Sequence, residues 1–193
     1  MTIEERRARD RAARRRLIVA TARKLAETEG WDAVTTRRLS TEIEYSQPVL
    51  YKHFSGMDAI AEAVAVDGFG ELTDALRTAR TGAATPEDGF RRIAHAYVDF
   101  ARENPALYDA MFTRATTLHF AAADTPPQLS TAFAAIRGAV AAISELSDVD
   151  TATEVVWAAL HGLATLSRSG RLRPEQEFER IEVLADQFTR TVR

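Results

Sequence analysis

The chain has 193 residues, with 25 Lys and Arg, 28 Asp and Glu, 46% hydrophobic residues and no cysteine. Without cysteine it has no disulfide framework, no thiolate metal site and no thiol nucleophile. Its longest apolar runs, such as residues 155–160, are far shorter than the roughly 18–20 residues that span a bilayer, so we expect a soluble, cytoplasmic chain.

The formal net charge of −3 is unevenly distributed. Residues 1–53 carry 12 basic and 8 acidic side chains, a net of +4, whereas residues 54–193 carry 13 and 20, a net of −7. A basic start ahead of an acidic body favours a contact with nucleic acid or another anionic surface on the basic side.

The N-terminal third reads as one long helix followed by two short ones. Residues 1–9 are polar and are expected to be frayed, and an apolar stripe then predicts a helix from about residue 10 to residue 29, closed by Gly30. Thr35 or Thr36 suits the N-cap of a short helix that ends near Ile43. Ser46 caps a second short helix over residues 47–53, whose first turn tolerates a proline.

The rest of the chain is also helical in pattern, after a break at residues 55–56. The predicted helices cover about residues 57–80, 86–102, 105–113, 127–146, 151–169 and a terminal stretch that ends near residue 192. Residues 114–124 are ambiguous. The sequence therefore predicts an all-α fold of about nine helices, divided into residues 1–56 and residues 57–193.

Residues 34–54 have the dimensions of a helix-turn-helix, because two short helices are joined by about three residues. The residues spaced to form a shared core with the first helix are Val34, Leu39, Ile43, Leu50 and Phe54. The second short helix is left with an outer face of Gln47, Pro48, Val49, Tyr51, Lys52 and His53. Such a helix fits the major groove, where glutamine bonds base edges and apolar atoms meet thymine methyl groups. The side chains suited to phosphate oxygens are those of Thr36, Arg37, Ser46, Tyr51, Lys52 and His53.

Residues 14–60 resemble the DNA-binding domain of TetR-family transcriptional regulators, including the Leu-Tyr-Lys-His-Phe ending of the recognition helix at residues 50–54. The resemblance implies that Gln47, Pro48 and Val49 face the bases. It also implies that the DNA backbone is held by Thr36, Tyr51, Lys52 and His53. Two positions depart from the family pattern. Glu44 stands where the family often has glycine, which predicts different backbone angles in the turn. Met57 stands where many relatives have lysine, which predicts the loss of one phosphate contact.

The C-terminal part is similar to the ligand-domain subgroup known for a Trp-His-Gly motif, through Trp157, His161 and Gly162. The candidate ligand-binding residues are Phe69, Tyr97, Phe100, Tyr108, Met111, Phe112, Phe120, Phe133, Trp157 and His161. The same set also fits an ordinary core. Tyr97, Tyr108 and His161 are the better cavity candidates, because each brings a polar atom that needs a partner when buried.

The arginine-rich start, with seven arginines between residues 6 and 16, fits either a solvated arm or, ahead of a helix-turn-helix, an arm that binds phosphate or the minor groove. The last two helices carry wide apolar bands. We interpret one band as the face of a homodimer, in which each chain contributes two helices to a four-helix interface; packing only within the chain is the alternative.

Nothing in the sequence indicates catalysis. No histidine has the Glu-x-x-His spacing of a di-iron bundle, and there is no glycine-rich phosphate loop or nucleophile elbow, so we predict no enzyme activity, metal or cofactor. The sequence predicts a homodimeric transcriptional regulator, more readily a repressor, which binds a palindromic double-stranded operator and responds to a small molecule. The alternatives are a protein-binding helical module and a small-molecule sequestration module with weak or no specific DNA binding.

Overall fold

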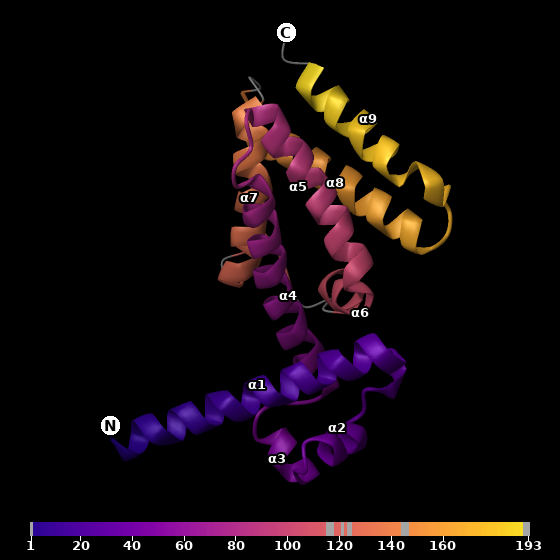
Figure 1. Ribbon diagram of the computed structural model, residues 1–193. Helices are drawn as coiled ribbons and strands as arrows, with labels where there is room; N and C mark the ends of the chain where they lie inside the picture. The colour runs from indigo at the N-terminus through magenta and orange to yellow at the C-terminus, as the bar shows by residue number, and fades with distance from the viewer. Residues whose placement is uncertain (1, 115–117, 121, 123–124, 144–146, 191–193) are drawn as a thin grey trace. The chain divides into compact units, whose positions relative to one another are not determined.

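The computed structural model describes residues 2–114, 118–120, 122, 125–143 and 147–190, and this part of the chain is all-α, as predicted. Three short helical turns accompany the α-helices: η1 (Trp31–Ala33), η2 (Ala110–Arg114, a π-helix) and η3 (Pro174–Gln176). The α-helices of Figure 1 are α1 (Ile3–Glu29), α2 (Thr36–Glu42), α3 (Gln47–Tyr51), α4 (Met57–Arg80), α5 (Pro86–Glu103), α6 (Pro105–Asp109), α7 (Pro127–Ile143), α8 (Val149–Arg168) and α9 (Glu177–Arg190). None of the described helices is long and apolar enough to cross a bilayer.

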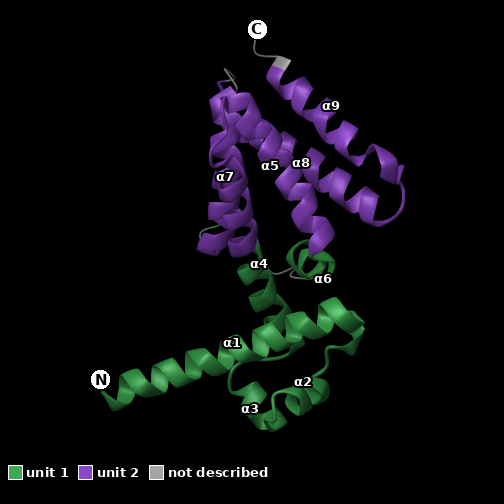
Figure 2. Ribbon diagram, viewed as in Figure 1, with its two compact units in different colours: residues 1–68, 104–124 green, residues 69–103, 125–193 purple. Residues whose placement is uncertain are grey.

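The chain folds into two compact units (Figure 2). The first unit comprises residues 1–68 and 104–124, and the second comprises residues 69–103 and 125–193. The helix α4 passes from the first unit into the second at Gly68. The functional boundary at residue 56 stays a prediction, because compactness does not measure which residues bind DNA or a ligand.

The core of the first unit joins α1 to the two short helices. The predicted core residues Val34, Leu39, Ile43, Leu50 and Phe54 are all at most 7% exposed. They pack with the apolar stripe of α1, which buries Ile18, Val19, Ala22, Leu25 and Ala26. Burial of this set is the main source of stability for the short helices, since five- and seven-residue helices are not stable alone.

The start of α1 differs from the prediction. Residues 3–9 are helical rather than frayed, because Thr2 and Glu5 form a capping box. The Thr2 hydroxyl accepts from the Glu5 amide at 3.2 Å, and the Glu5 carboxylate accepts from the Thr2 amide at 2.7 Å. These bonds satisfy amide groups that the first helical turn leaves without a partner.

The short helix α6 is attached to the C-terminal end of α1 by polar contacts. The two carboxylate oxygens of Glu27 accept from the amides of Ala106 and Leu107, at 3.1 and 2.9 Å. The Trp31 indole donates to the Ala106 carbonyl at 2.9 Å, and the Arg23 guanidinium donates to Asn104 at 3.0 Å. Residues 104–109 are thereby part of the same unit as the helix-turn-helix.

The predicted helix at 105–113 is instead α6 followed by the π-helical η2. Arg114 donates to Asp109 at 2.9 Å, and this five-residue spacing matches the wider period of a π-helix. The predicted ends of the helices at residues 146 and 192 lie outside the described residues.

Gly68 allows α4 to approach α6 and η2 closely. A Cβ atom at this position would lie 2.8 Å from Leu107 Cδ1 and 2.8 Å from Met111 Sδ, and both of these side chains are buried. Gly70, on the same helix, has no atom within 4 Å of such a Cβ.

We expect Gly68→Ala to lower the free energy of unfolding by about 1 kcal/mol, since overpacking costs more than the helix propensity gained. The matched change Gly70→Ala should raise it by about 0.5–1 kcal/mol, because alanine favours the helix without a clash. Urea unfolding of the two variants measures both values. Equal stability of the two variants would contradict the close approach.

In the second unit, α5 is surrounded by α7, α8 and α9. Tyr97 of α5 is fully buried. Polar contacts join α5 to α9: Arg91 forms ion pairs with Glu182 at 2.5 Å and with Asp186, and the His95 ring lies 2.9 Å from a Glu182 carboxylate oxygen. The ring of His95 also stacks on that of Phe178, with centroids 4.8 Å apart.

Candidate nucleic-acid interface

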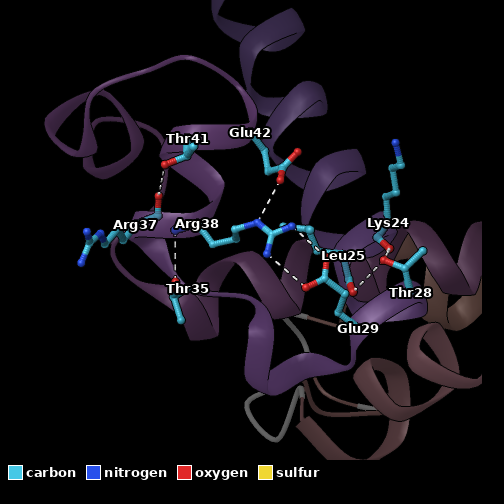
Figure 3. A network of polar contacts seen from close by, with 9 residues as sticks. All are labelled: Lys24, Leu25, Thr28, Glu29, Thr35, Arg37, Arg38, Thr41 and Glu42. Atoms are coloured by element: carbon cyan, nitrogen blue, oxygen red, sulfur yellow. Dashed lines mark hydrogen bonds and ion pairs between the residues drawn. The ribbon is translucent and has the colours of Figure 1, made fainter.

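The helix α2 is fixed at its start by Thr35, whose hydroxyl accepts from the Arg38 amide at 3.1 Å. The Arg38 guanidinium then bonds Glu29 of α1 at 2.8 and 3.0 Å and Glu42 of α2 at 2.9 Å. These hydrogen bonds, which Arg38 donates, raise the pKa of Arg38; the bond to Glu42 has the larger effect and the bond to Glu29 the next. Figure 3 shows that the neighbouring side chain of Arg37 extends away from this network. Of the two arginines, Arg37 therefore remains available for a phosphate.

The turn between α2 and α3 contains Glu44, whose φ angle is 56°. This is the left-handed backbone conformation that favours glycine, and it costs other residues about 1–2 kcal/mol. The turn thus keeps a glycine-like geometry despite the glutamate, so the predicted change of backbone angles is wrong. Thr36 is half-buried at the start of α2, and Ser46 is exposed at the N-cap of α3, where its side chain makes no capping hydrogen bond.

The helix α3 presents the outer face that the sequence predicted. Leu50 is 1% exposed and anchors the helix, whereas Tyr51 is 54% exposed. Three other residues of this face are exposed, namely Gln47, Pro48 and Lys52. The remaining two, Val49 and His53, are half-buried. The α-helix ends at Tyr51, and Lys52 and His53 continue in a turn whose amides bond the carbonyls of Val49 and Leu50.

His53 lies beside arginines of α1. Its carbonyl accepts from Arg15 at 3.1 Å, and the Arg15 guanidinium lies 4.1 Å above the ring of the adjacent Phe54. Burial lowers the pKa of His53, and the positive charges of Arg11, Arg14, Arg15 and Lys52 lower it further. The imidazole is therefore neutral at pH 7 in the protein without DNA.

A phosphate beside His53 would favour the protonated imidazole, so DNA binding should raise its pKa. We expect affinity for double-stranded DNA to increase as the pH falls from 8 to 6, by at most about tenfold per pH unit for each histidine that takes up a proton. Without DNA, the stability of the protein depends on pH in the opposite sense and decreases as the pH falls, because the unfolded chain binds the proton at His53 more readily than the folded chain does. The contribution of His53 to stability is therefore lost as the pH falls below about 6.5. Fluorescence anisotropy from pH 6 to pH 8 measures the first effect, and an unchanged slope in His53→Gln would contradict it.

The candidate ligand residues divide between the two units. In the second unit, the Trp157 indole donates to the Tyr97 hydroxyl at 3.0 Å, and the Phe133 ring lies edge-on to Trp157 with centroids 6.3 Å apart. His161, one turn along α8 from Trp157, is half-buried, and its pKa is lowered by burial and then by Arg168. Phe69 and Phe100 are also buried and belong to this unit.

The remaining candidates belong to the first unit. Tyr108 and Met111 are buried, and the rings of Tyr108 and Phe112 lie 4.6 Å apart. Phe120 is 37% exposed, so it is not a core residue. Among the candidates, Tyr97, Trp157 and Phe133 lie together, joined by the hydrogen bond and the ring contact given above.

Sequence reasoning missed three residues whose contacts position the helices of the candidate nucleic-acid interface, namely Arg38, Arg15 and Glu27. Arg38 stands four residues before Glu42, a spacing that indicates an ion pair on a helix, so a signal for it was present. Arg15 and Glu27 carry no such signal, since their partners are 38 to 80 residues away along the chain.

Two family models match the chain. The one described as bacterial regulatory proteins of the tetR family matches residues 18–64, and the one described as the tetracyclin repressor-like C-terminal domain matches residues 90–192. The narrower resemblance to a Trp-His-Gly subgroup stays a prediction.

Individual relatives agree with these matches. The chain is 30% identical over 164 residues to the uncharacterized HTH-type transcriptional regulator Rv0681 of Mycobacterium tuberculosis, covering 81% of this chain and 71% of the relative. It is 38% identical over 98 residues to the uncharacterized HTH-type transcriptional regulator YobS of Bacillus subtilis, and spans about half the length of that relative, 49%. A solved structure of a protein of unknown function from Rhodococcus sp. RHA1 matches with a TM-score of 0.74 at 29% identity, covering 92% of this chain and 94% of the other.

Proposed function

The chain belongs to the TetR family of bacterial transcriptional regulators, and from this premise we propose that it is a repressor released from a palindromic operator by a small-molecule effector. The observation that carries the proposal is the exposed face of α3, with Tyr51 54% exposed above a Leu50 anchor that is 1% exposed. Gln47, Pro48 and Val49 would read base edges in the major groove. Thr36, Arg37, Ser46, Tyr51, Lys52 and His53 would hold the phosphates on either side.

A homodimer through α8 and α9 would give the two-fold symmetry that a palindrome requires. Large apolar side chains on these helices support this, because Val155, Leu166, Phe178 and Val183 are between 38% and 63% exposed in the single chain. A second copy would cover these side chains, whereas packing within the chain leaves them in water. The two recognition helices would then lie about 34 Å apart, or a multiple of that distance.

Release by an effector would be a population shift between a form that binds the operator and a form that does not. Residues 57–193 would bind the effector and residues 1–56 the DNA, with α4 joining the two. Tyr97, Trp157 and His161 are the residues that we expect to recognise a polar group on the effector, because the first two already share a hydrogen bond and the third is a half-buried neutral imidazole.

The experiment that tests the proposal is a fluorescence-anisotropy titration of the full chain against the DNA flanking its own gene. A shuffled duplex of the same composition runs beside it at two salt concentrations. We expect the flanking DNA to bind about 10³-fold more tightly than the shuffled duplex, with steeply salt-dependent binding to both. Equal weak binding to DNA flanking the gene and to a genomic fragment library would overturn the proposal and favour a module that binds proteins or small molecules.

A further inference from the structure

The N-terminal part of α1 extends well beyond the core of the first unit. Residues 3–17, here called the arginine arm, are all exposed, and the first buried residue of the helix is Ile18. Fifteen helical residues correspond to about 22 Å of length at 1.5 Å per residue. Figure 1 shows the arm passing beyond the α2–α3 pair.

The arm is strongly basic on a defined face. The arm contains seven arginines and three acidic residues, which gives it a net charge of +4. The core stripe of α1 places Ile18, Ala22 and Leu25 four and three residues apart. Continuing the same alternation toward the N-terminus leads to Arg14, Arg11 and Arg7, here called the arginine stripe.

Three of the four other arginines lie on the opposite side of the arm. At about 100° per residue, Arg6, Arg9 and Arg16 lie roughly 110–170° around the helix from the stripe. The chain therefore offers two sets of three arginines, equal in charge and similar in distance from the core, which differ in the direction they face.

The stripe lies on the side of α1 that faces the helix-turn-helix. Arg15, at the base of the arm, contacts the carbonyl of His53 and the ring of Phe54, immediately after α3. The positive charges of Arg11 and Arg14 also lower the pKa of His53, as expected of arginines on the face of α1 toward the end of α3. The stripe thus continues the basic surface that Lys52 and His53 begin.

We propose that Arg7, Arg11 and Arg14 form a second DNA contact, which binds the sugar-phosphate backbone of the duplex outside the half-site read by α3. This inference rests on the proposed function, since a duplex held against α3 is what the arm would meet. The arm is a helix about 10–12 Å across and cannot enter a minor groove about 6 Å wide, so it contacts the backbone from outside. Its length of about 22 Å corresponds to about six base pairs at 3.4 Å each.

The test compares two duplexes and two variants. One duplex ends at the outer edge of the half-sites, as mapped by footprinting, and the other adds about ten base pairs of arbitrary sequence at each end, more than the arm can span. The variants are Arg7→Ala/Arg11→Ala/Arg14→Ala and, as the matched control, Arg6→Ala/Arg9→Ala/Arg16→Ala. Alanine keeps the helix propensity, and circular dichroism checks that both variants fold.

We expect wild type and the control to bind the longer duplex about tenfold or more tightly than the shorter one, whatever the flanking sequence. The stripe variant should lose this gain, and its slope of log K against log salt should fall by about 2.7 for each bound arm, or about 0.9 per lost phosphate contact. Equal losses in the two variants would mean that only total charge matters and would overturn the inference, as would wild-type binding that does not depend on duplex length.

Failure of the proposed function would look different. Wild type would then show no preference for the mapped sequence over a shuffled one. The comparison of stripe and control variants on shuffled duplexes of the two lengths would still decide whether the stripe binds backbone.

Discussion

Tyr51→Ala should weaken binding to the operator about 30-fold, with no change in the melting temperature of the protein. Tyr51 is 54% exposed, so removal of its ring leaves the core of the first unit intact. A hydroxyl bonded to a phosphate contributes about 1.5–3 kcal/mol, and a loss of about 2 kcal/mol corresponds to the stated factor. Fluorescence anisotropy and thermal unfolding of the same sample measure the two quantities.

The conservative change Tyr51→Phe separates the hydroxyl from the ring. If the hydroxyl carries the contact, this variant should lose nearly as much affinity as Tyr51→Ala. Operator affinity equal to wild type in folded Tyr51→Ala would show that α3 does not present this face to the duplex.

Glu27→Ala should lower the free energy of unfolding by about 3 kcal/mol, the largest effect on stability that we expect from a single polar side chain. Its two carboxylate oxygens accept from the amides of Ala106 and Leu107, and hydrogen bonds to a charged group contribute about 1.5–3 kcal/mol each. Alanine would leave both amides at the start of α6 without this acceptor. Urea unfolding measures the loss, and hydrogen exchange at the two amides locates it.

Glu27→Gln is the control, because its amide oxygen still accepts one of the two hydrogen bonds. We expect it to lose about half as much stability as the alanine variant. Loss of stability without faster exchange at Ala106 and Leu107 would mean that Glu27 acts elsewhere than at α6.

Local signals in the sequence predicted most of the helices. The bounds of α4 match the prediction at both ends, since a break at residues 55–56 and a glycine-containing linker at residues 81–86 delimit it. The start of α1 was missed because residues 3–9 have no apolar stripe, while the Thr2–Glu5 capping box that begins the helix depends on polar side chains. A prediction based on the spacing of apolar residues depends on an apolar stripe and overlooks a capping box made of polar side chains.

The candidate site was predictable where its residues are consecutive. The outer face of α3 follows from helical spacing and from the burial of Leu50. Contacts between distant segments were not predictable, since nothing in the vicinity of Glu27 indicates a partner about 80 residues away. For the ligand candidates, composition identified buried aromatic residues such as Tyr97 and Tyr108, but it could not assign them to different units.

The first unit is discontinuous along the chain, and this sets the order in which a nascent molecule can fold. Residues 104–109, to which Glu27 bonds, are synthesised only after all of α5. At about 5–20 residues per second, roughly 3–10 seconds pass between synthesis of residue 56 and of residue 109. During this interval the helix-turn-helix is complete in sequence, but α1 lacks its contacts with α6, so the first unit can be completed only after residues 69–103 of the second unit have been synthesised.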